Sequence, residues 1–159
     1  MKEISWPKEI ETAKTSKSAQ RRIAALYLSQ SDRIEQRVNS KIEQLHILRA
    51  MSTRVTTLLS DMPKSNIGSS SKLEEIVVKI IDLEHEIESE MNRLVDVKKE
   101  ITETIRGIQP PEQTVLELCY LCNKPMELIA EEIHFSVGHT YRLRNKGLEL
   151  VAQQLQERR

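Results

Sequence analysis

Two long stretches of the chain carry apolar residues at alternating intervals of three and four, which is the pattern of helices that pack along a common seam. The first runs from about residue 23 to residue 60, and the second from residue 72 to residue 108. Each predicts a helix of roughly 36 to 40 residues, about 55 Å long at 1.5 Å per residue. The seam positions are Tyr27, Ser31, Ile34, Val38, Lys41, Leu45, Leu48, Ser52, Val55 and Leu59, then Leu73, Ile76, Ile80, Leu83, Ile87, Glu90, Leu94, Val97, Ile101, Thr104 and Ile108.

Residues 61–71 separate the two stretches and contain a proline, a glycine and a serine triplet, which end a helix. So short a connection makes the two helices antiparallel neighbours, and residues 23–108 are therefore predicted to form a helical hairpin. Pairing Leu59 with Leu73 sets the register and places Lys41 beside Glu90. Two interpretations of these charges stay open: a buried ion pair that fixes the register, or two side chains that reach from the seam edge into solvent.

Further apolar side chains lie off the predicted seam. Fully burying one such side chain is worth roughly 1.5–3 kcal/mol, so several exposed ones favour association. We expect a homodimer in which two hairpins form a four-helix bundle. The alternative is that the terminal domain or the N-terminal arm folds over this surface. The off-seam residues are Ile42, Ile47, Val77, Val78, Ile81, Met91 and Val95.

Residues 1–22 are polar and rich in Lys, Ser and Thr, and they predict a mobile or loosely helical arm. The basic residues of this arm either touch DNA or are solvated.

Residues 111–155 predict three short helices that follow one another closely. Asn123-Lys124-Pro125 breaks the first from the second, and Ser136 suits the N-cap of the third. A second helix, a tight turn and a third helix with basic residues make a helix-turn-helix. The turn has His134, which tolerates a left-handed conformation better than most residues. The inward faces are Val115, Leu118, Cys119 and Cys122; Met126, Ile129, Ala130 and Ile133; and Thr140, Leu143, Gly147, Leu148 and Val151.

The third helix is the candidate for contact with double-stranded DNA. Arg142 suits guanine O6 and N7, and Asn145 suits adenine N6 and N7. Tyr141 suits a base methyl or a phosphate, whereas Arg144, Lys146 and His139 suit phosphates. The alternative is a solvated basic helix face. The predicted DNA-binding residues are Ser136, Val137, Gly138, His139, Tyr141, Arg142, Arg144, Asn145 and Lys146.

The segment from Pro110 to Val151 resembles region four, the promoter-reading C-terminal region of bacterial sigma factors. The likeness lies in the Leu-rich first helix, in Ile129-Ala130, in the Ser136 cap and in the closing Lys146-Gly147-Leu148. The longer run from Ile80 to Arg142 is similar to small sigma-like proteins of Gram-positive phages and prophages, which include ArpU-type regulators of late transcription. The resemblance implies a transcription regulator that binds DNA and engages RNA polymerase.

Val137 and Gly138 depart from the resemblance, because sigma region four usually carries charged residues there. The usual promoter element is therefore not the expected target. Nothing in the chain resembles the sigma parts that melt DNA, so a complete sigma factor is not expected.

Composition narrows the classes of function. Lys plus Arg and Asp plus Glu each number 24 in 159 residues, so any contact with nucleic acid must be local. Charged residues make up 30% and aromatic residues 3%, as is typical of long helices. No apolar run is long enough to span a membrane, and the chain is expected to be cytoplasmic with reduced cysteines. No catalytic set and no cofactor motif emerges, so no enzyme is expected.

One spacing resembles a zinc finger: Cys119 and Cys122 are followed by His134 and His139. Because both cysteines continue the apolar face of the first short helix, buried thiols are favoured over a metal site. Two other function classes stay open: a packaging protein like a small terminase, and an adaptor whose helix-turn-helix binds polymerase or another regulator.

Overall fold

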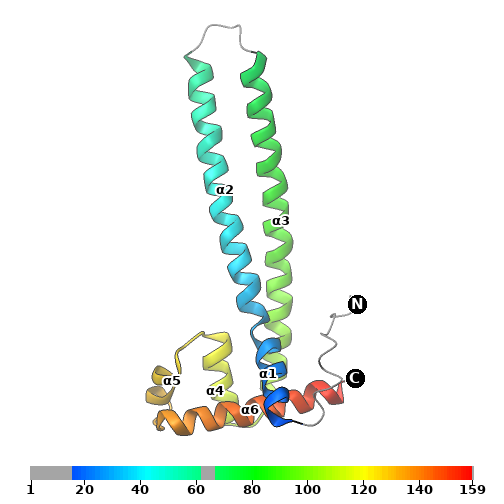
Figure 1. Cartoon of the computed structure of the whole chain (residues 1–159), viewed down its shortest axis with the longest axis vertical. Coiled ribbons are helices and arrows are strands. Elements are labelled where there is room, and N and C mark those ends of the chain that lie inside the picture. Colours follow the sequence, from blue (N-terminus) through cyan, green and yellow to red (C-terminus); the bar gives the residue numbers. More distant parts are fainter. Residues whose placement is uncertain (1–15, 62–66, 159) are drawn as a thin grey trace. The chain divides into compact units, whose positions relative to one another are not determined.

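A computed structural model describes residues 16–61 and 67–158 of the chain (Figure 1). The described residues contain helices and turns but no strand, which confirms the predicted all-α fold. Residues 1–15, which make up most of the predicted arm, and residues 62–66 of the predicted loop lie outside the described residues. The helices are α1 (Lys17–Leu28), α2 (Gln30–Ser60), α3 (Ile67–Arg106), α4 (Glu112–Leu116), the π-helical turn η3 (Glu117–Leu121), α5 (Met126–Glu132) and α6 (Val137–Glu157).

The described residues divide into two compact units. Residues 31–96, from α2 and the first part of α3, form the hairpin unit. Residues 16–30 and 97–158 form the second unit, which we call the helix-turn-helix unit. The end of α3 thus belongs with the C-terminal helices, whereas the sequence pattern assigned it to the hairpin. The reason is that Ile101, Ile105 and Ile108 pack into the core of the helix-turn-helix unit.

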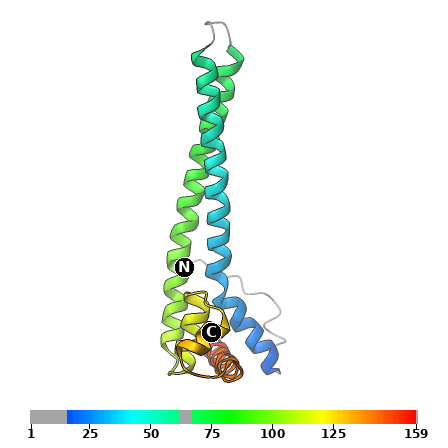
Figure 2. The same ribbon diagram turned by 90° about the vertical axis from the view of Figure 1, so that its left-hand side faces the viewer.

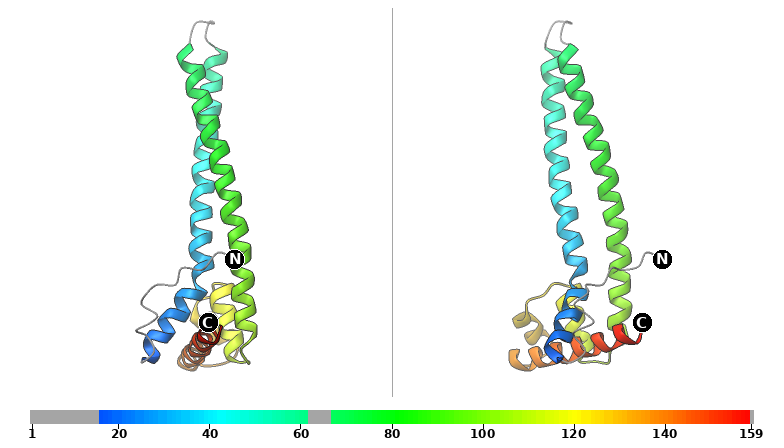
Figure 3. Two further views of the ribbon diagram at one scale, coloured as in Figure 1. Left: turned by 90° about the vertical axis from the view of Figure 1, so that its right-hand side faces the viewer. Right: turned by 45° about the vertical axis from the view of Figure 1, so that its right-hand side comes forward.

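In the hairpin unit, α2 and α3 run side by side in opposite directions (Figures 2 and 3). Every predicted seam residue between 31 and 94 is buried or half-buried. The most enclosed apolar ones are Ile34, Val38, Leu45, Ile76 and Ile87. The alternation of three and four residues was therefore a correct guide to the inward face of both helices.

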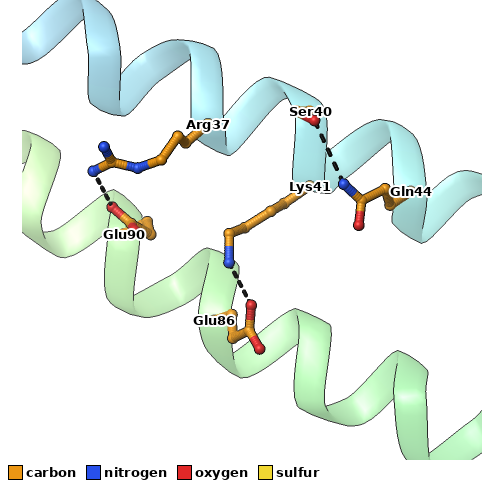
Figure 4. A network of polar contacts seen from close by, with 6 residues as sticks. All are labelled: Arg37, Ser40, Lys41, Gln44, Glu86 and Glu90. Carbon is orange, nitrogen blue, oxygen red and sulfur yellow. Dashed lines mark hydrogen bonds and ion pairs between the residues drawn. The ribbon is translucent and has the colours of Figure 1, made fainter.

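The charged residues of the seam find other partners than the predicted ones. Arg37 donates to Glu90 at 3.1 Å, and Lys41 pairs with Glu86 (Figure 4). The predicted contact between Lys41 and Glu90 is thus replaced by two contacts, each to a residue one helical turn away. The reason is reach: these long side chains cross from α2 to α3 at the edge of the seam, where the Glu86 side chain is mostly exposed to water.

These hairpin ion pairs lie at the surface, where such pairs contribute about 0.2–1 kcal/mol each. A third pair, Arg49 with Glu84 at 2.6 Å, also joins α2 to α3. The structure therefore supports the interpretation of solvent-reaching charges over that of a buried pair.

The hairpin unit exposes many apolar side chains away from its seam. Val95 is 66% exposed and Val78 is 56% exposed. On α3, four of these residues each directly follow a seam position, so they form a strip on one face of the helix, which Glu84 and Glu88 interrupt: Val77, Ile81, Met91 and Val95. The prediction of apolar surface off the seam is correct for all the residues named except Ile42, which is half-buried.

The core of the helix-turn-helix unit is built around α1 and α6. Ala24, Tyr27 and Leu28 of α1 pack with Leu148 and Val151 of α6. Helix α1 begins at Lys17, inside the stretch predicted to be a loose arm. Its first turns are held by ion pairs of Lys17 and Arg21 with Glu149, at 3.8 and 2.8 Å, which the sequence pattern did not reveal.

Tyr27 adds a polar contact inside this core. Its hydroxyl donates to Glu100 Oε1 at 3.0 Å and lies 3.2 Å from Thr104 Oγ1. Burial raises the pKa of Tyr27 to about 12, so the phenol stays neutral and available as a donor. Arg158 donates to the same threonine hydroxyl at 3.1 Å, which ties the end of α6 to α3.

Candidate nucleic-acid interface

The first short helix of the C-terminal region changes its winding partway along. After α4 the backbone forms the π-helical turn η3, with Cys122 N–H bonded to Glu117 O at 3.1 Å. A wider turn shifts the positions that follow it. As a result Tyr120 is buried and Cys122 is exposed, whereas the sequence pattern predicted Cys122 on the inward face. Val115 is fully buried, and Leu118 and Cys119 are half-buried.

The break between η3 and α5 falls at the predicted place. Asn123 has a positive φ of 52°, a conformation that asparagine tolerates well. Pro125 precedes α5, where its missing N–H leaves no helical hydrogen bond unmade. On α5, Met126, Ile129 and Ala130 are buried as predicted.

A tight turn joins α5 to α6. His134 adopts a left-handed conformation with φ of 60°. The N–H of Phe135 bonds to Ala130 O at 3.0 Å, and the N–H of His134 bonds to Glu131 O at 3.2 Å. This pair of bonds is the Schellman motif, which satisfies the last carbonyls of a helix. The prediction that histidine supports the turn is therefore correct.

Ser136 begins α6 as the predicted cap, since its hydroxyl accepts from the N–H of His139 at 3.2 Å. The predicted inward residues of α6 are all buried, which are Thr140, Leu143, Gly147, Leu148 and Val151. Gly147 marks the place where α6 lies against α4, because a Cβ there would be 2.9 Å from Leu116 Cδ1. The glycine thus sets the close crossing of these two helices.

The outward face of α6 begins with Val137, Gly138, Tyr141 and Arg142, all exposed. Asn145, one turn further on, is half-buried. Arg142 makes no ion pair or hydrogen bond with residues 16–61 or 67–158. Four of the five residues predicted on the outward face are thus exposed, and they include one cation, Arg142, that is unpaired within the described residues.

The residues predicted to bind phosphates also make contacts within the helix-turn-helix unit. Arg144 is half-buried and donates to the Tyr120 hydroxyl at 3.0 Å, with its guanidinium 5.8 Å from the ring centre. Burial alone would lower the pKa of Arg144, but the phenol of Tyr120 raises it, so the guanidinium remains charged.

Lys146 pairs with Glu112 at 2.5 Å, and the Glu112 carboxylate is almost completely buried. This hydrogen bond from Lys146 holds the pKa of Glu112 below the ordinary value of 4.5. His139 packs edge-on against Phe135, with ring centres 4.8 Å apart. Of the three fixed positive charges between His139 and Lys146, only Arg142 is therefore unpaired within the described part of the chain.

Sequence reasoning missed the exposed apolar residues of α5 and of the turn that follows it. Leu128 on α5 and Phe135 in the turn are 54% and 44% exposed. Exposed glutamates surround Leu128, namely Glu127, Glu131 and Glu132, and the last of these pairs with Lys124 at 2.6 Å. The sequence indicates that both side chains are exposed, because neither Leu128 nor Phe135 fits the spacing of three and four that places residues on the inward face of α5.

The zinc-finger spacing does not produce a cluster. Within residues 16–61 and 67–158, no group of three or more His, Cys, Asp or Glu side chains is placed to hold a metal ion. Cys119 instead packs against both hydrophobic clusters of the unit, and both cysteines are free thiols. In the same described ranges, no helix is both long and apolar enough to cross a membrane.

A model of a protein family matches residues 57–151, and its description is "Protein of unknown function (DUF1492)". The match covers more than half of the chain, including all of α3, α4, η3 and α5. A search of curated proteins and a search of solved structures each returned no match.

Proposed function

The chain belongs to the DUF1492 family, and we propose that it is a sequence-specific DNA-binding transcription regulator. In this proposal α6 enters the major groove of double-stranded DNA, and α5 crosses above it. The proposal is supported by the likeness of the C-terminal segment to region four of sigma factors and to ArpU-type phage regulators. The proposed regulator is of a phage or prophage type and is not a complete sigma factor.

One observation carries the proposal: the first turns of α6 expose Val137, Tyr141 and unpaired Arg142 on a helix that follows a tight turn. The inward residues of α5 and α6 hold this face outward, because their buried side chains fix the rotation of both helices. An exposed arginine at this position suits bidentate recognition of guanine.

We further propose that two copies associate through the hairpin unit. The exposed strip of Val77, Ile81, Met91 and Val95 supports this, since burying such side chains between two hairpins removes apolar surface from water. A dimer would present two copies of α6 to two half-sites, which is how helix-turn-helix proteins reach high affinity.

A second candidate function is an adaptor that binds RNA polymerase through the helix-turn-helix unit. It is favoured by exposed Leu128 and Phe135 and by the glutamates of α5. Exposed glutamates repel phosphates, whereas an apolar patch with an acidic rim suits a basic protein surface. The two functions are compatible if α6 meets DNA while α5 meets polymerase.

The decisive experiment is selection of bound duplexes from random DNA with the full chain. We expect a consensus site and an affinity that falls steeply as salt rises, because phosphate contacts release counterions. Absence of any enriched sequence would contradict the regulator. Binding to purified bacterial RNA polymerase that is weakened by Leu128→Ser and unaffected by Arg142→Ala would support the adaptor.

A further inference from the structure

We propose that the protein reads its site chiefly through the methyl groups of thymine, with a single guanine contact from Arg142. This inference rests on the proposed function, because it concerns the same face of α6. The target site is a guanine next to T·A base pairs whose C5-methyl groups line the major groove.

The reading face is mostly apolar. Val137 is 39% exposed and Tyr141 is 40% exposed, and both lie on the first two turns of α6. Apolar side chains in the major groove gain contact with the thymine methyl, which no other standard base carries. A charged or amide side chain at position 137 would instead seek a hydrogen bond to a base edge.

Gly138 leaves open space on the same face. Apart from its chain neighbours and the nearby backbone of α6 itself, no heavy atom lies within 4 Å of the place where its Cβ would be, and its φ is not positive. Neither packing within the chain nor backbone conformation therefore requires glycine here. A bare backbone between Val137 and Tyr141 lets a base edge and its methyl group approach α6 closely.

Few side chains on this face are free to form hydrogen bonds with base edges. Arg144 donates to Tyr120, Asn145 is half-buried, and Lys146, whose side chain is 68% exposed, pairs with Glu112. Arg142 is thus the exposed cation of the first turns of α6 that has no partner among the described residues, and its positive charge complements a polyanion. Discrimination between bases must then come largely from apolar contacts.

The test uses the full chain and the best duplex obtained by selection from random DNA. Each thymine of the site is replaced, one at a time, by deoxyuridine, which removes only the methyl group and keeps every hydrogen-bonding atom. Because one buried methyl corresponds to about a fourfold change in affinity, we expect about a fourfold loss at one or two thymines that flank the guanine.

A protein variant assigns the methyl contact. In Val137→Ser, the difference in affinity between the thymine and the deoxyuridine duplex should disappear at one position. Leu26→Ser is the matched control, because Leu26 is also an exposed apolar residue of the helix-turn-helix unit but lies on α1. This control should keep the full difference. Circular dichroism checks that both variants remain helical.

The outcomes separate the two proposals. Failure to select any sequence overturns both of them. A selected site that Arg142→Ala weakens, but that deoxyuridine leaves unchanged at every thymine, overturns the methyl reading and keeps the regulator. A deoxyuridine effect that persists in Val137→Ser and in Tyr141→Ser also overturns the assignment, because other residues would then contact the methyl groups.

Discussion

In the proposed function, Arg142 is the side chain on which DNA recognition most directly depends. We predict that Arg142→Ala costs roughly 1–3 kcal/mol of binding free energy on the selected site and relaxes preference at one base pair. The reason is loss of a bidentate contact to guanine. Fluorescence anisotropy with the selected duplex and its single-base variants measures both effects.

The control for this substitution is Arg54→Ala, because Arg54 is an exposed arginine of α2 in the hairpin unit. It removes the same charge and should leave the preference at each base pair unchanged. An Arg142 variant that binds every duplex as the native chain does would show that α6 does not read bases.

Glu112 gives the helix-turn-helix unit a dependence on pH. Its pKa is lowered by the hydrogen bond from Lys146, so the pair stabilises the fold above the ordinary pKa of 4.5. This stabilisation is lost as the pH falls below 4.5 through the lowered pKa, because protonation removes the charge that Lys146 binds. We call the decline in the free energy of unfolding below pH 4.5 the acid limb. We predict that Glu112→Gln makes this acid limb less steep, as measured by urea unfolding at several pH values.

Glu103→Gln provides the comparison, since Glu103 is an exposed carboxylate of α3 in the same unit. It should leave the acid limb as steep as in the native chain. Equal flattening in both variants would mean that the limb reports general charge rather than the contact between Glu112 and Lys146.

At the level of helices, two glycines of α6 offer a matched pair. A Cβ at Gly147 would lie 2.9 Å from Leu116 Cδ1, and Leu116 is fully buried, so the crossing of α4 and α6 must shift. We predict that Gly147→Ala destabilises the fold by about 1–3 kcal/mol, as overpacking does. Urea unfolding followed by circular dichroism measures the change.

Gly138→Ala should have the opposite effect on stability. Its Cβ would meet open space, and alanine favours a helix over glycine by about 1 kcal/mol. We predict a slightly more stable protein whose affinity for the selected duplex is reduced, because the new methyl group occupies the space left for a base edge. Gain of stability with unchanged affinity would show that DNA does not approach Gly138.

For the molecule as a whole, the proposed association through the hairpin unit would decide how many copies of α6 meet DNA. We predict a dimer at micromolar concentration in sedimentation equilibrium. The double variant Val77→Ser and Ile81→Ser should weaken the dimer at least about tenfold, because each buried apolar side chain contributes roughly 1.5–3 kcal/mol. Both side chains are exposed on α3.

The corresponding control is Lys79→Ser with Asp82→Ser, which changes two exposed residues of the same segment and leaves the net charge unaltered. This variant should associate as the native chain does. A native chain that sediments as a monomer would contradict the hairpin dimer, and the single α6 would then need a longer contact with DNA.

The sequence by itself determined the features that depend on neighbouring residues. Spacing of three and four fixed the inward faces of α2, α3, α5 and α6, because a helix repeats every 3.6 residues. Local chemistry fixed the cap at Ser136 and the left-handed turn at His134. The candidate reading face follows from these signals, so the sequence alone predicts that Val137, Tyr141 and Arg142 lie on the outward side of α6.

Only the tertiary structure decided which side chains meet across helices. The π-helical turn buries Tyr120, which then accepts a hydrogen bond from half-buried Arg144. Glu112 likewise pairs with Lys146, and Glu149 pairs with Lys17 at the start of α1. Such contacts join residues far apart in the chain, so they depend on the packing of α1, α4 and α6 rather than on any local pattern. Packing therefore gives partners to Arg144 and Lys146, and of the three fixed charges between His139 and Lys146 it leaves Arg142 unpaired within the described residues.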